Sequence, residues 1–261
     1  MSNNPIIKIA GNKSYRVNFS SQPQSQPPSQ NRRGVSIITC TERPAYLQNI
    51  LQNFLRQDFT PKELIIIINN NAIDLGLWRR QTAEYPRVRV LRVDERIGQG
   101  SCLNYAAHQA SYDYVAKFDD DDYYSPTYLS NSVAALENSG AGLVGKASWF
   151  LYFEGSGTLA LFSPGNEDTF VDRVTGATML IRKSILKRIR FRNLDAGEDV
   201  EFCRDCTRNN IRIYATDRYN FVGIRRLDVD SHTWQDSEER ILEDCVIIAH
   251  TDDYQSIASR P

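Results

Sequence analysis

Apolar and amphipathic stretches alternate along the first half of the chain. Four stretches are short and apolar enough to form buried strands: residues 35–39, 64–68, 87–93 and 114–118. Three amphipathic stretches between them predict helices at 47–55, 75–85 and 101–110. This alternation predicts a parallel sheet with right-handed helical crossovers. In such sheets ligands bind beyond the carboxyl ends of the strands.

The pattern changes after residue 122. A helix is predicted over 126–137, and the aromatic stretch 143–153, a Gly-rich turn and the stretch 159–162 together predict a hairpin. Three further elements are predicted downstream: a strand at 177–182 and helices at 184–188 and 198–207. The second half is therefore a mixed α/β addition that closes over the ligand edge of the first half.

The N-terminal region differs from the rest in composition. Residues 1–20 form a small segment whose apolar alternation around a Gly-Asn-Lys turn is compatible with a hairpin. Residues 21–34 are rich in Ser, Gln and Pro and are predicted to be a flexible linker. The main domain then occupies residues 35–261.

Charge and composition exclude several classes of protein. The 261 residues include 31 basic and 32 acidic ones, a formal net charge of -1, so no global field attracts nucleic acid and none is predicted as a partner. No apolar run approaches the roughly 20 residues that span a bilayer, and the N-terminus lacks a signal-peptide pattern, so a cytoplasmic location without a transmembrane segment is expected.

The spacing of the cysteines does not match a disulfide framework or a zinc-binding motif. Their number, five, is odd, and they are scattered over the chain, which argues against a secreted disulfide scaffold. Cys203 and Cys206 form one CxxC, but a zinc ribbon needs a second ligand pair. We therefore expect Cys203 and Cys206 to be two small side chains on one face of a helix.

Four consecutive carboxylates, Asp119 to Asp122, follow directly on the strand at 114–118. Their mutual repulsion is costly unless cations lie among them, and hard divalent cations prefer oxygen ligands. A carboxylate pair at the ligand edge of a sheet suits a metal that also binds phosphates. The alternatives are a solvated acidic turn and a calcium-binding surface module. An EF-hand is excluded because its glycine and its final glutamate are missing.

Several motifs occur in a specific order between Val35 and Trp234. They are VSIITCTERPAYLQNILQNFLRQ, LIIIINNN, RIGQGSCLNYA, FDDDDYYSPTYL and GEDVEF. In this order they resemble a family-two glycosyltransferase of the GT-A fold. The resemblance implies a Rossmann-like nucleotide-binding half at 35–122, with a mostly parallel sheet, and a mixed α/β acceptor half with a C-terminal tail at 123–261.

The resemblance also implies roles for the acidic run. Asp119 and Asp121 match the DxD motif, in which the last carboxylate binds Mn²⁺ or Mg²⁺ directly and the metal bridges the two phosphates of a sugar nucleotide. Such a metal stabilises the charge of the departing diphosphate as a Lewis acid. Because all four positions are Asp, Asp120 or Asp122 can share or replace these roles.

The motif GEDVEF resembles the ED motif of the acceptor half. There Asp199 matches the general base that takes the proton of the acceptor hydroxyl, and Glu198 matches a supporting residue. Without the resemblance, both acids would be read as favourable charges in the first turn of a helix. Direct displacement by a hydroxyl inverts the anomeric centre. His232 matches a family position that completes the metal or diphosphate site, and Trp234 can pack on a sugar or on the core.

The resemblance places the rest of the donor site at the carboxyl ends of the first strands. These positions are Thr39, Thr41 and Arg43 for the base and ribose, Asn70 after the second strand, and Arg96 and Asn104 near the base and diphosphate. The family usually has an Asp where Asn70 stands, and an Asn both donates and accepts, so the preference for a uridine nucleotide is weakened. Gly98 and Gly100 allow a close approach of backbone.

Together these residues predict a metal-dependent, inverting glycosyltransferase. Its donor is a nucleoside-diphosphate sugar of the UDP, GDP or dTDP type, and its acceptor is a carbohydrate or another hydroxyl compound. The alternative is a catalytically inactive sugar-nucleotide-binding or scaffold protein of the same fold, which the departure at Asn69 to Asn71 favours.

Overall fold

The computed structural model describes residues 6–9, 13–16, 32–228, 234 and 236–261. The chain divides into two compact units, Met1–Asn31 and Arg32–Pro261. Within the first unit, Ile6–Ile9 (β1) and Lys13–Arg16 (β2) pair antiparallel, with Ile6 opposite Arg16. The predicted linker lies outside the described residues up to Asn31.

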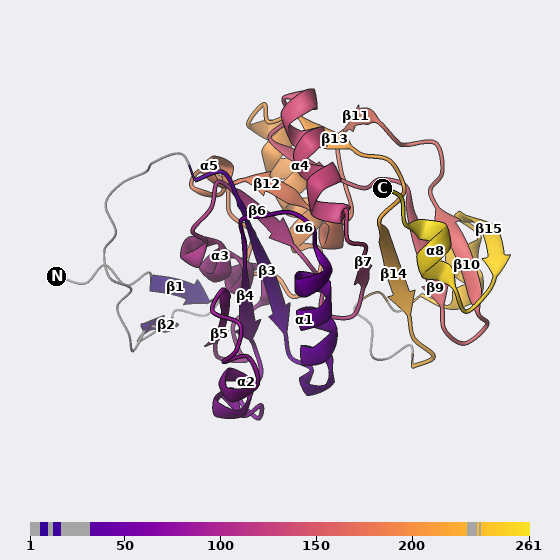
Figure 1. The fold of residues 1–261 in the computed structure, drawn as a ribbon. Coiled ribbons are helices and arrows are strands. Elements are labelled where there is room, and N and C mark those ends of the chain that lie inside the picture. The colour runs from indigo at the N-terminus through magenta and orange to yellow at the C-terminus, as the bar shows by residue number, and fades with distance from the viewer. Residues whose placement is uncertain (1–5, 10–12, 17–31, 229–233, 235) are drawn as a thin grey trace. The chain divides into compact units, whose positions relative to one another are not determined.

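The second unit contains two sheets and the helices that pack on them (Figure 1). Its strands are β3 (Val35–Thr41), β4 (Lys62–Ile68), β5 (Val88–Arg92), β6 (Tyr114–Lys117), β7 (Tyr123–Tyr124), β8 (Leu143–Gly145), β9 (Trp149–Phe153), β10 (Thr158–Phe162), β11 (Thr169–Val171), β12 (Leu180–Arg182), β13 (Ile213–Ala215), β14 (Phe221–Arg225) and β15 (Cys245–His250).

The α-helices are α1 (Leu47–Arg56), α2 (Leu75–Gln81), α3 (Gln99–Gln109), α4 (Tyr128–Ser139), α5 (Lys183–Leu186), α6 (Glu198–Arg208), α7 (Glu238–Leu242) and α8 (Tyr254–Ala258). Two 3₁₀ turns, η1 (Pro44–Tyr46) and η2 (Gly176–Thr178), lie in the loops after β3 and β11.

The larger sheet has the strand order β11-β13-β8-β12-β6-β3-β4-β5. Strand β3 pairs in parallel with β4 and β6, and β4 pairs in parallel with β5. Strand β12 lies antiparallel between β6 and β8, and β11 is antiparallel to β13. The predicted α/β fold with a mostly parallel sheet is therefore confirmed, and the parallel strands bring the carboxyl ends of β3 and β6 together.

Strands β3 and β4 form the centre of the core. Ile37 of β3 and Ile66 of β4 belong to the same buried cluster as Ile50 and Phe54 of α1. The residues that alternate with them are also fully buried, and α3 contacts both strands. Continuous apolar runs are typical of strands that are covered on both faces, which explains why these segments were readable from the sequence.

The smaller sheet, with the order β15-β10-β9-β14-β7, brings together segments that are distant in sequence. The predicted hairpin is present as the antiparallel pair β9–β10. The sequence pattern does not predict the strands that complete this sheet: β14 lies parallel to β9, and β15 lies along the outer side of β10. Helices α7 and α8 are also unpredicted, and α2 ends at Gln81 rather than at residue 85.

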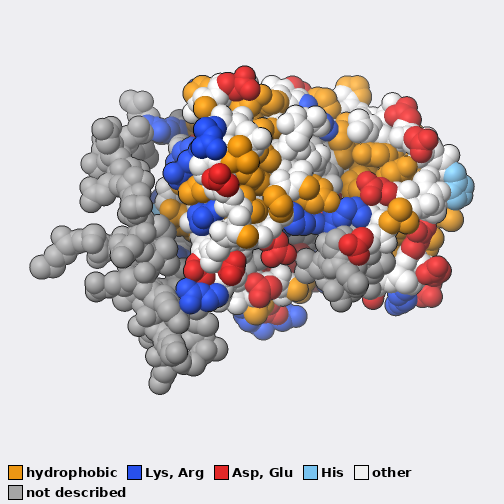
Figure 2. Space-filling model, turned by 90° about the horizontal axis from the view of Figure 1, so that it is seen from below, with side chains coloured by type: hydrophobic (Ala, Val, Ile, Leu, Met, Phe, Trp, Pro, Cys, Tyr) orange, Lys and Arg blue, Asp and Glu red, His pale blue; other side chains and the backbone are white. Residues whose placement is uncertain are grey.

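No helix among the described residues is long and apolar enough to cross a membrane. On the face drawn in Figure 2, acidic and basic side chains are interspersed rather than separated into a field of one sign. This distribution agrees with the formal net charge of -1.

The first turn of helix α3 touches the segment that leads into α6. The backbone nitrogen of Gly100 donates to the carbonyl of Leu194 at 3.1 Å. A β-carbon on Gly100 would lie 1.7 Å from the carbonyl oxygen of Arg192, which no side chain tolerates. The predicted close approach of backbone at Gly100 therefore occurs, and its partner is the segment that leads into α6.

We expect Gly100→Ala to destabilise the protein by about 1–3 kcal/mol or more, because the added methyl group forces two backbone segments apart. Gly76→Ala is the matched control, since Gly76 also lies in a helix but meets only the flexible side chains of Asp74 and Arg80. Alanine there should be neutral or stabilising. Urea unfolding measures both variants, and equal stability of the two would contradict this interpretation.

Candidate active site

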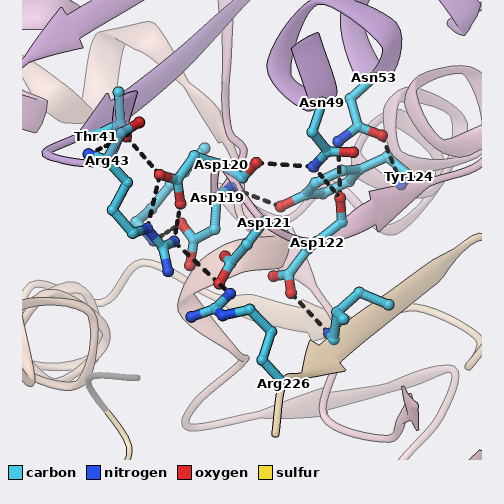
Figure 3. A network of polar contacts seen from close by, with 12 residues as sticks. Thr41, Arg43, Asn49, Asn53, Asp119, Asp120, Asp121, Asp122, Tyr124 and Arg226 are labelled. Carbon is cyan, nitrogen blue, oxygen red and sulfur yellow. Dashed lines mark hydrogen bonds and ion pairs between the residues drawn. The ribbon is translucent and has the colours of Figure 1, made fainter. Parts of the chain in front are cut away.

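The acidic run lies in the loop between β6 and β7, at the carboxyl ends of the parallel strands β3 and β6. Figure 3 shows that the side chains of Asp119 to Asp122 point in different directions and meet partners from different parts of the chain. The four carboxylates therefore have different surroundings, although Asp120 and Asp121 share Arg43.

Asp120 is buried against the end of β3. Its carboxylate accepts a hydrogen bond from Thr41 Oγ1 at 2.5 Å and pairs with the guanidinium of Arg43, whose Nε lies at 3.1 Å. Burial and the charge of Asp121 raise the pKa of Asp120, against the effect of Arg43. Asp120 thus fixes the two predicted donor-site residues Thr41 and Arg43 in place.

Asp121 is held between two arginines. Its carboxylate lies 3.0 Å from Arg43 and is also paired with Arg226, which follows β14. Burial opposes ionisation, but the two guanidinium groups outweigh it and lower the pKa of Asp121. Tyr46 lies under both arginines, with its ring centre 4.5 Å from the Arg43 guanidinium carbon and 5.3 Å from that of Arg226. Asp121 is therefore an ionised carboxylate among fixed positive charges.

Asp122 has a different environment. Asp122 is half-buried, and its carboxylate accepts a hydrogen bond from the backbone nitrogen of Ile224 in β14 at 3.1 Å. Its carbonyl oxygen accepts from the side-chain amides of Asn49 and Asn53 at 3.0 and 2.8 Å. Burial, together with the charges of Asp121 and Asp119, raises the pKa of Asp122 well above its usual range. These contacts favour a structural role in joining helix α1 to the smaller sheet.

Asp119 connects the run to the interior. Its backbone nitrogen donates to the hydroxyl of Tyr124 at 2.8 Å, and that hydroxyl donates to the carbonyl of Ala177. Its carboxylate pairs with Lys117 at 2.5 Å, and the Lys117 side chain is only 3% exposed. Asp119 itself is 36% exposed and remains accessible to a ligand.

Glu198 and Asp199 occupy the first turn of α6, as the sequence predicts. Glu198 is buried and accepts a weak hydrogen bond from the amide of Gln99 at 3.4 Å. Burial, against the attraction of Lys117, raises the pKa of Glu198 to about 7. Asp199 is half-buried beside Gly176, where an added β-carbon would lie 2.5 Å from its carboxylate. The charges of Lys117, Asp199 and Asp119 thus all act on Glu198.

The remaining predicted donor residues are divided between loops and core. Thr39 is buried within β3. Asn70 donates to the carbonyl of Glu42 at 2.8 Å and thereby links the loops after β4 and β3. Arg96 pairs with Asp94 at 2.7 Å on an exposed loop. Asn104 exchanges two hydrogen bonds with the backbone of Phe191, at 2.7 and 3.0 Å, which favours a structural role where α3 meets the segment that leads into α6.

Two further predicted positions, 232 and 234, follow β14 in the sequence. His232 lies outside the described residues. The ring of Trp234 packs edge-on against Phe162 at 5.6 Å, and its indole nitrogen donates to Asp236 at 2.6 Å. Trp234 therefore contacts the protein itself, one of the two roles considered for it.

Sequence reasoning missed two basic residues, Arg226 and Lys117. A lysine inside an otherwise apolar strand was a usable signal for Lys117, because a buried ammonium group requires a carboxylate partner. Arg226 gave no local signal, since it reaches Asp121 only through the pairing of β14 with β7.

Comparison with known proteins identifies the family. The family model described as glycosyl transferase family 2 matches residues 35–190, and the chain belongs to this family. No curated protein sequence matches the chain.

Solved structures of similar fold include S. aureus TarS 1-349, with 18% identity and a TM-score of 0.56 over 73% of this chain and 60% of that one. Another is the mannosyltransferase PcManGT from Pyrobaculum calidifontis, in complex with GDP-Man and Mn²⁺, with 17% identity and a TM-score of 0.57 over 82% of this chain and 62% of that one. The chain thus spans less than two thirds of their length. At these identities the likeness shows the fold, which is GT-A as predicted.

The raised pKa of Glu198 predicts a pH-dependent stability. Between the pKa of a free glutamate, about 4.3, and that of folded Glu198, about 7, the native state holds a proton that the unfolded state has lost. Stability therefore falls as the pH rises through this window. We expect Glu198→Gln to match the parent near pH 5 and to exceed its stability at pH 8 by up to about 3 kcal/mol.

Urea unfolding between pH 5 and pH 8 measures this difference. Glu201→Gln on the same helix is the control, because Glu201 forms ion pairs with Arg192 and Arg204 and should lose stability instead. A difference between Glu198→Gln and the parent that stays constant with pH would contradict the assignment.

Proposed function

We propose that the chain transfers a sugar from a nucleoside-diphosphate sugar to an acceptor hydroxyl, with inversion at the anomeric carbon. The observation that carries the proposal is the geometry of one edge of the sheet. There the ionised Asp121 lies between Arg43 and Arg226, and the accessible Asp119 lies beside the buried Lys117. Membership of glycosyl transferase family 2 supports it.

The basic residues of this edge suit a diphosphate. Arg43 and Arg226 present guanidinium groups, which bind phosphate oxygens in a planar, two-pronged geometry. As the bond between the anomeric carbon and the phosphate oxygen breaks, negative charge develops on the leaving diphosphate, and fixed cations stabilise it. Solved GT-A structures in complex with UDP-GlcNAc and with GDP-Man support a donor of this class. The choice among UDP, GDP and dTDP donors is part of the proposal.

The residues present also fit a divalent metal. The described residues contain no group of three or more metal-ligating side chains, but Mg²⁺ commonly binds through one or two carboxylates together with substrate phosphates. Asp121, kept ionised by its neighbours, would hold Mn²⁺ or Mg²⁺, with Asp119 as the second carboxylate. When bound, the metal would supply Lewis-acid stabilisation of the leaving diphosphate.

The residues that act on the acceptor hydroxyl in this proposal lie in the first turn of α6. Asp199, half-buried and facing Gly176, takes the proton from the acceptor hydroxyl as its oxygen attacks the anomeric carbon. Glu198, with a pKa of about 7, is buried behind it and supports the charge balance of the pair. A single displacement of this kind leaves the product with inverted configuration.

An inactive nucleotide-binding protein of the same fold is the second candidate. One observation favours it: Asp121 is already paired with Arg43 and Arg226, so positive charge is provided at this position by the protein itself. In that case nucleotides would bind equally well without a divalent ion, and no donor would be turned over.

A thermal-shift panel tests donor binding and metal dependence. We expect UDP, GDP or dTDP to raise the melting temperature in the presence of Mn²⁺ and to lose most of the effect in EDTA, because a ligand that binds only the native state stabilises it. Asp121→Asn should abolish the Mn²⁺-dependent part. Asp217→Asn is the control, since Asp217 also pairs with a cation, Lys146, outside this site. A panel without any shift would overturn the proposal.

Asp199→Asn separates transfer from binding. We expect the variant to keep the nucleotide shift and to lose about 10²- to 10⁴-fold in kcat, the usual contribution of a placed general base. Asp205→Asn on the same helix is the control, because Asp205 pairs with Arg192 at the surface. Turnover is followed as nucleoside diphosphate released from the donor selected by the panel, with a set of saccharide acceptors. Unchanged kcat would exclude Asp199 as the base.

A further inference from the structure

A small cavity lies beside helix α4. Its walls are α4, which packs on β8 and β13 (Figure 1), the residue that follows β8, the residue that precedes β11, and the loop between β13 and β14. Its volume is about 80 Å³, several times the roughly 10–15 Å³ that one water molecule needs. None of its lining residues belongs to the candidate active site described above. The cavity is therefore a separate space with room for more than a single water.

Asn220 lines this cavity and carries an unpaired hydrogen-bond donor. The residue is 1% exposed, and its Oδ1 accepts from Ser125 Oγ at 2.7 Å and from the backbone nitrogen of Arg260 at 2.8 Å. These two donors fix which end of the amide is the oxygen. The other end, Nδ2, is buried and has no acceptor among the described residues. Because a buried donor without an acceptor is unfavourable, the cavity favours an occupant that brings an acceptor.

The position of Asn220 is fixed by the backbone around it. Its nitrogen donates to the carbonyl of Ala258 at 2.7 Å, and its carbonyl accepts from the nitrogen of Ser125 at 3.0 Å. Its φ is 74°, a left-handed value that asparagine adopts more readily than most residues. The free N–H group of Asn220 is therefore oriented before any ligand binds, which lowers the entropic cost of binding.

The charges around the cavity exclude an anion as its ligand. Lys146 is buried, and its ammonium group donates to the carboxylate of Asp217 at 3.2 Å, to the carbonyl of Asp217 at 2.7 Å and to Thr216 Oγ1 at 3.2 Å. The protein itself thus uses all three of its donors. The carboxylate of Asp168, which is exposed, adds a negative charge to the lining. A cation is disfavoured as well, because Asn220 offers a donor; a neutral hydroxyl group both accepts and donates.

We propose that this cavity is a binding site for a saccharide, separate from the transfer site. One sugar hydroxyl accepts from Asn220 Nδ2, and neighbouring hydroxyls bond to Ser132, which is buried, and to Asp168. Tyr128 and Tyr219 also line the cavity, and aromatic side chains are typical walls of such pockets. The cavity is smaller than the pockets that enclose whole ligands, so it takes one edge of the sugar and the rest lies outside.

Ligand-observed NMR with glucose, mannose, galactose and N-acetylglucosamine, in EDTA and without nucleotide, tests this site. We expect at least one of these sugars to bind the parent protein. Ala135→Leu should abolish binding, because Ala135 lines the cavity and a longer side chain fills it. Ala134→Leu is the matched control, since Ala134 is the neighbouring exposed residue of α4 and does not line the cavity. Absence of binding by all four sugars, or equal binding in the two variants, would overturn the proposal and leave the cavity to water.

Two further variants test the hydrogen bonds themselves. Asn220→Gly removes the free N–H group, and glycine adopts the positive φ without strain. We expect a loss in affinity of about 10-fold, the usual effect of one hydrogen bond in a binding site. Asp168→Asn changes an exposed residue, which does not endanger folding, and should weaken binding several-fold. Unchanged affinity in both variants would contradict the assignment, and these variants decide the question if Ala135→Leu does not fold.

Asp199→Asn locates the bound sugar. This variant alters the transfer site and should leave the saccharide affinity measured without nucleotide unchanged. Binding that requires Asp199 would place the sugar in the transfer site and overturn the proposal. None of these measurements uses a donor or turnover, so a failure of the proposed transfer function would not alter their outcome.

Discussion

The repulsion among four consecutive carboxylates is the constraint on which this end of the molecule depends. Adjacent unit charges a few Å apart repel by about 1 kcal/mol in water and by several times more near a protein surface. The fold offsets this by bringing three basic side chains to Asp119, Asp120 and Asp121, with Arg43 shared by the last two. Lys117 comes from β6, Arg43 from the loop after β3, and Arg226 from the loop after β14. The negative charge of Asp119 to Asp122 is therefore balanced only when these three segments meet.

This arrangement gives neighbouring residues unlike tasks. Asp122, half-buried and bound to the backbone of β14, connects that strand to helix α1, and Asp120 anchors Thr41 and Arg43. Among the three carboxylates that pair with basic side chains, Asp119 and Asp121 are more exposed than Asp120. Charged groups that are fixed before a ligand arrives need no reorganisation when phosphate charge develops, which is the physical advantage of the arrangement.

Features that depend on neighbouring residues could be predicted from the sequence, whereas features that depend on contacts between distant segments could not. Buried strands such as 64–68 and the start of α6 at Glu198 were readable because apolar runs and helix-start acids are local signals. The smaller sheet was not predicted, since β14 and β15 are defined by pairing with distant strands. Asn104 shows the same limit: its amide binds the backbone of Phe191, a contact that no motif in its own segment indicates.

The sequence by itself determined the fold class and the position of the acidic run at the carboxyl end of a parallel strand, because both depend on the order and periodicity of neighbouring residues. The tertiary structure decided what each carboxylate does. Four identical side chains in a row are indistinguishable locally, and only partners such as Ile224 and Arg226, brought in by the second sheet, make their environments different.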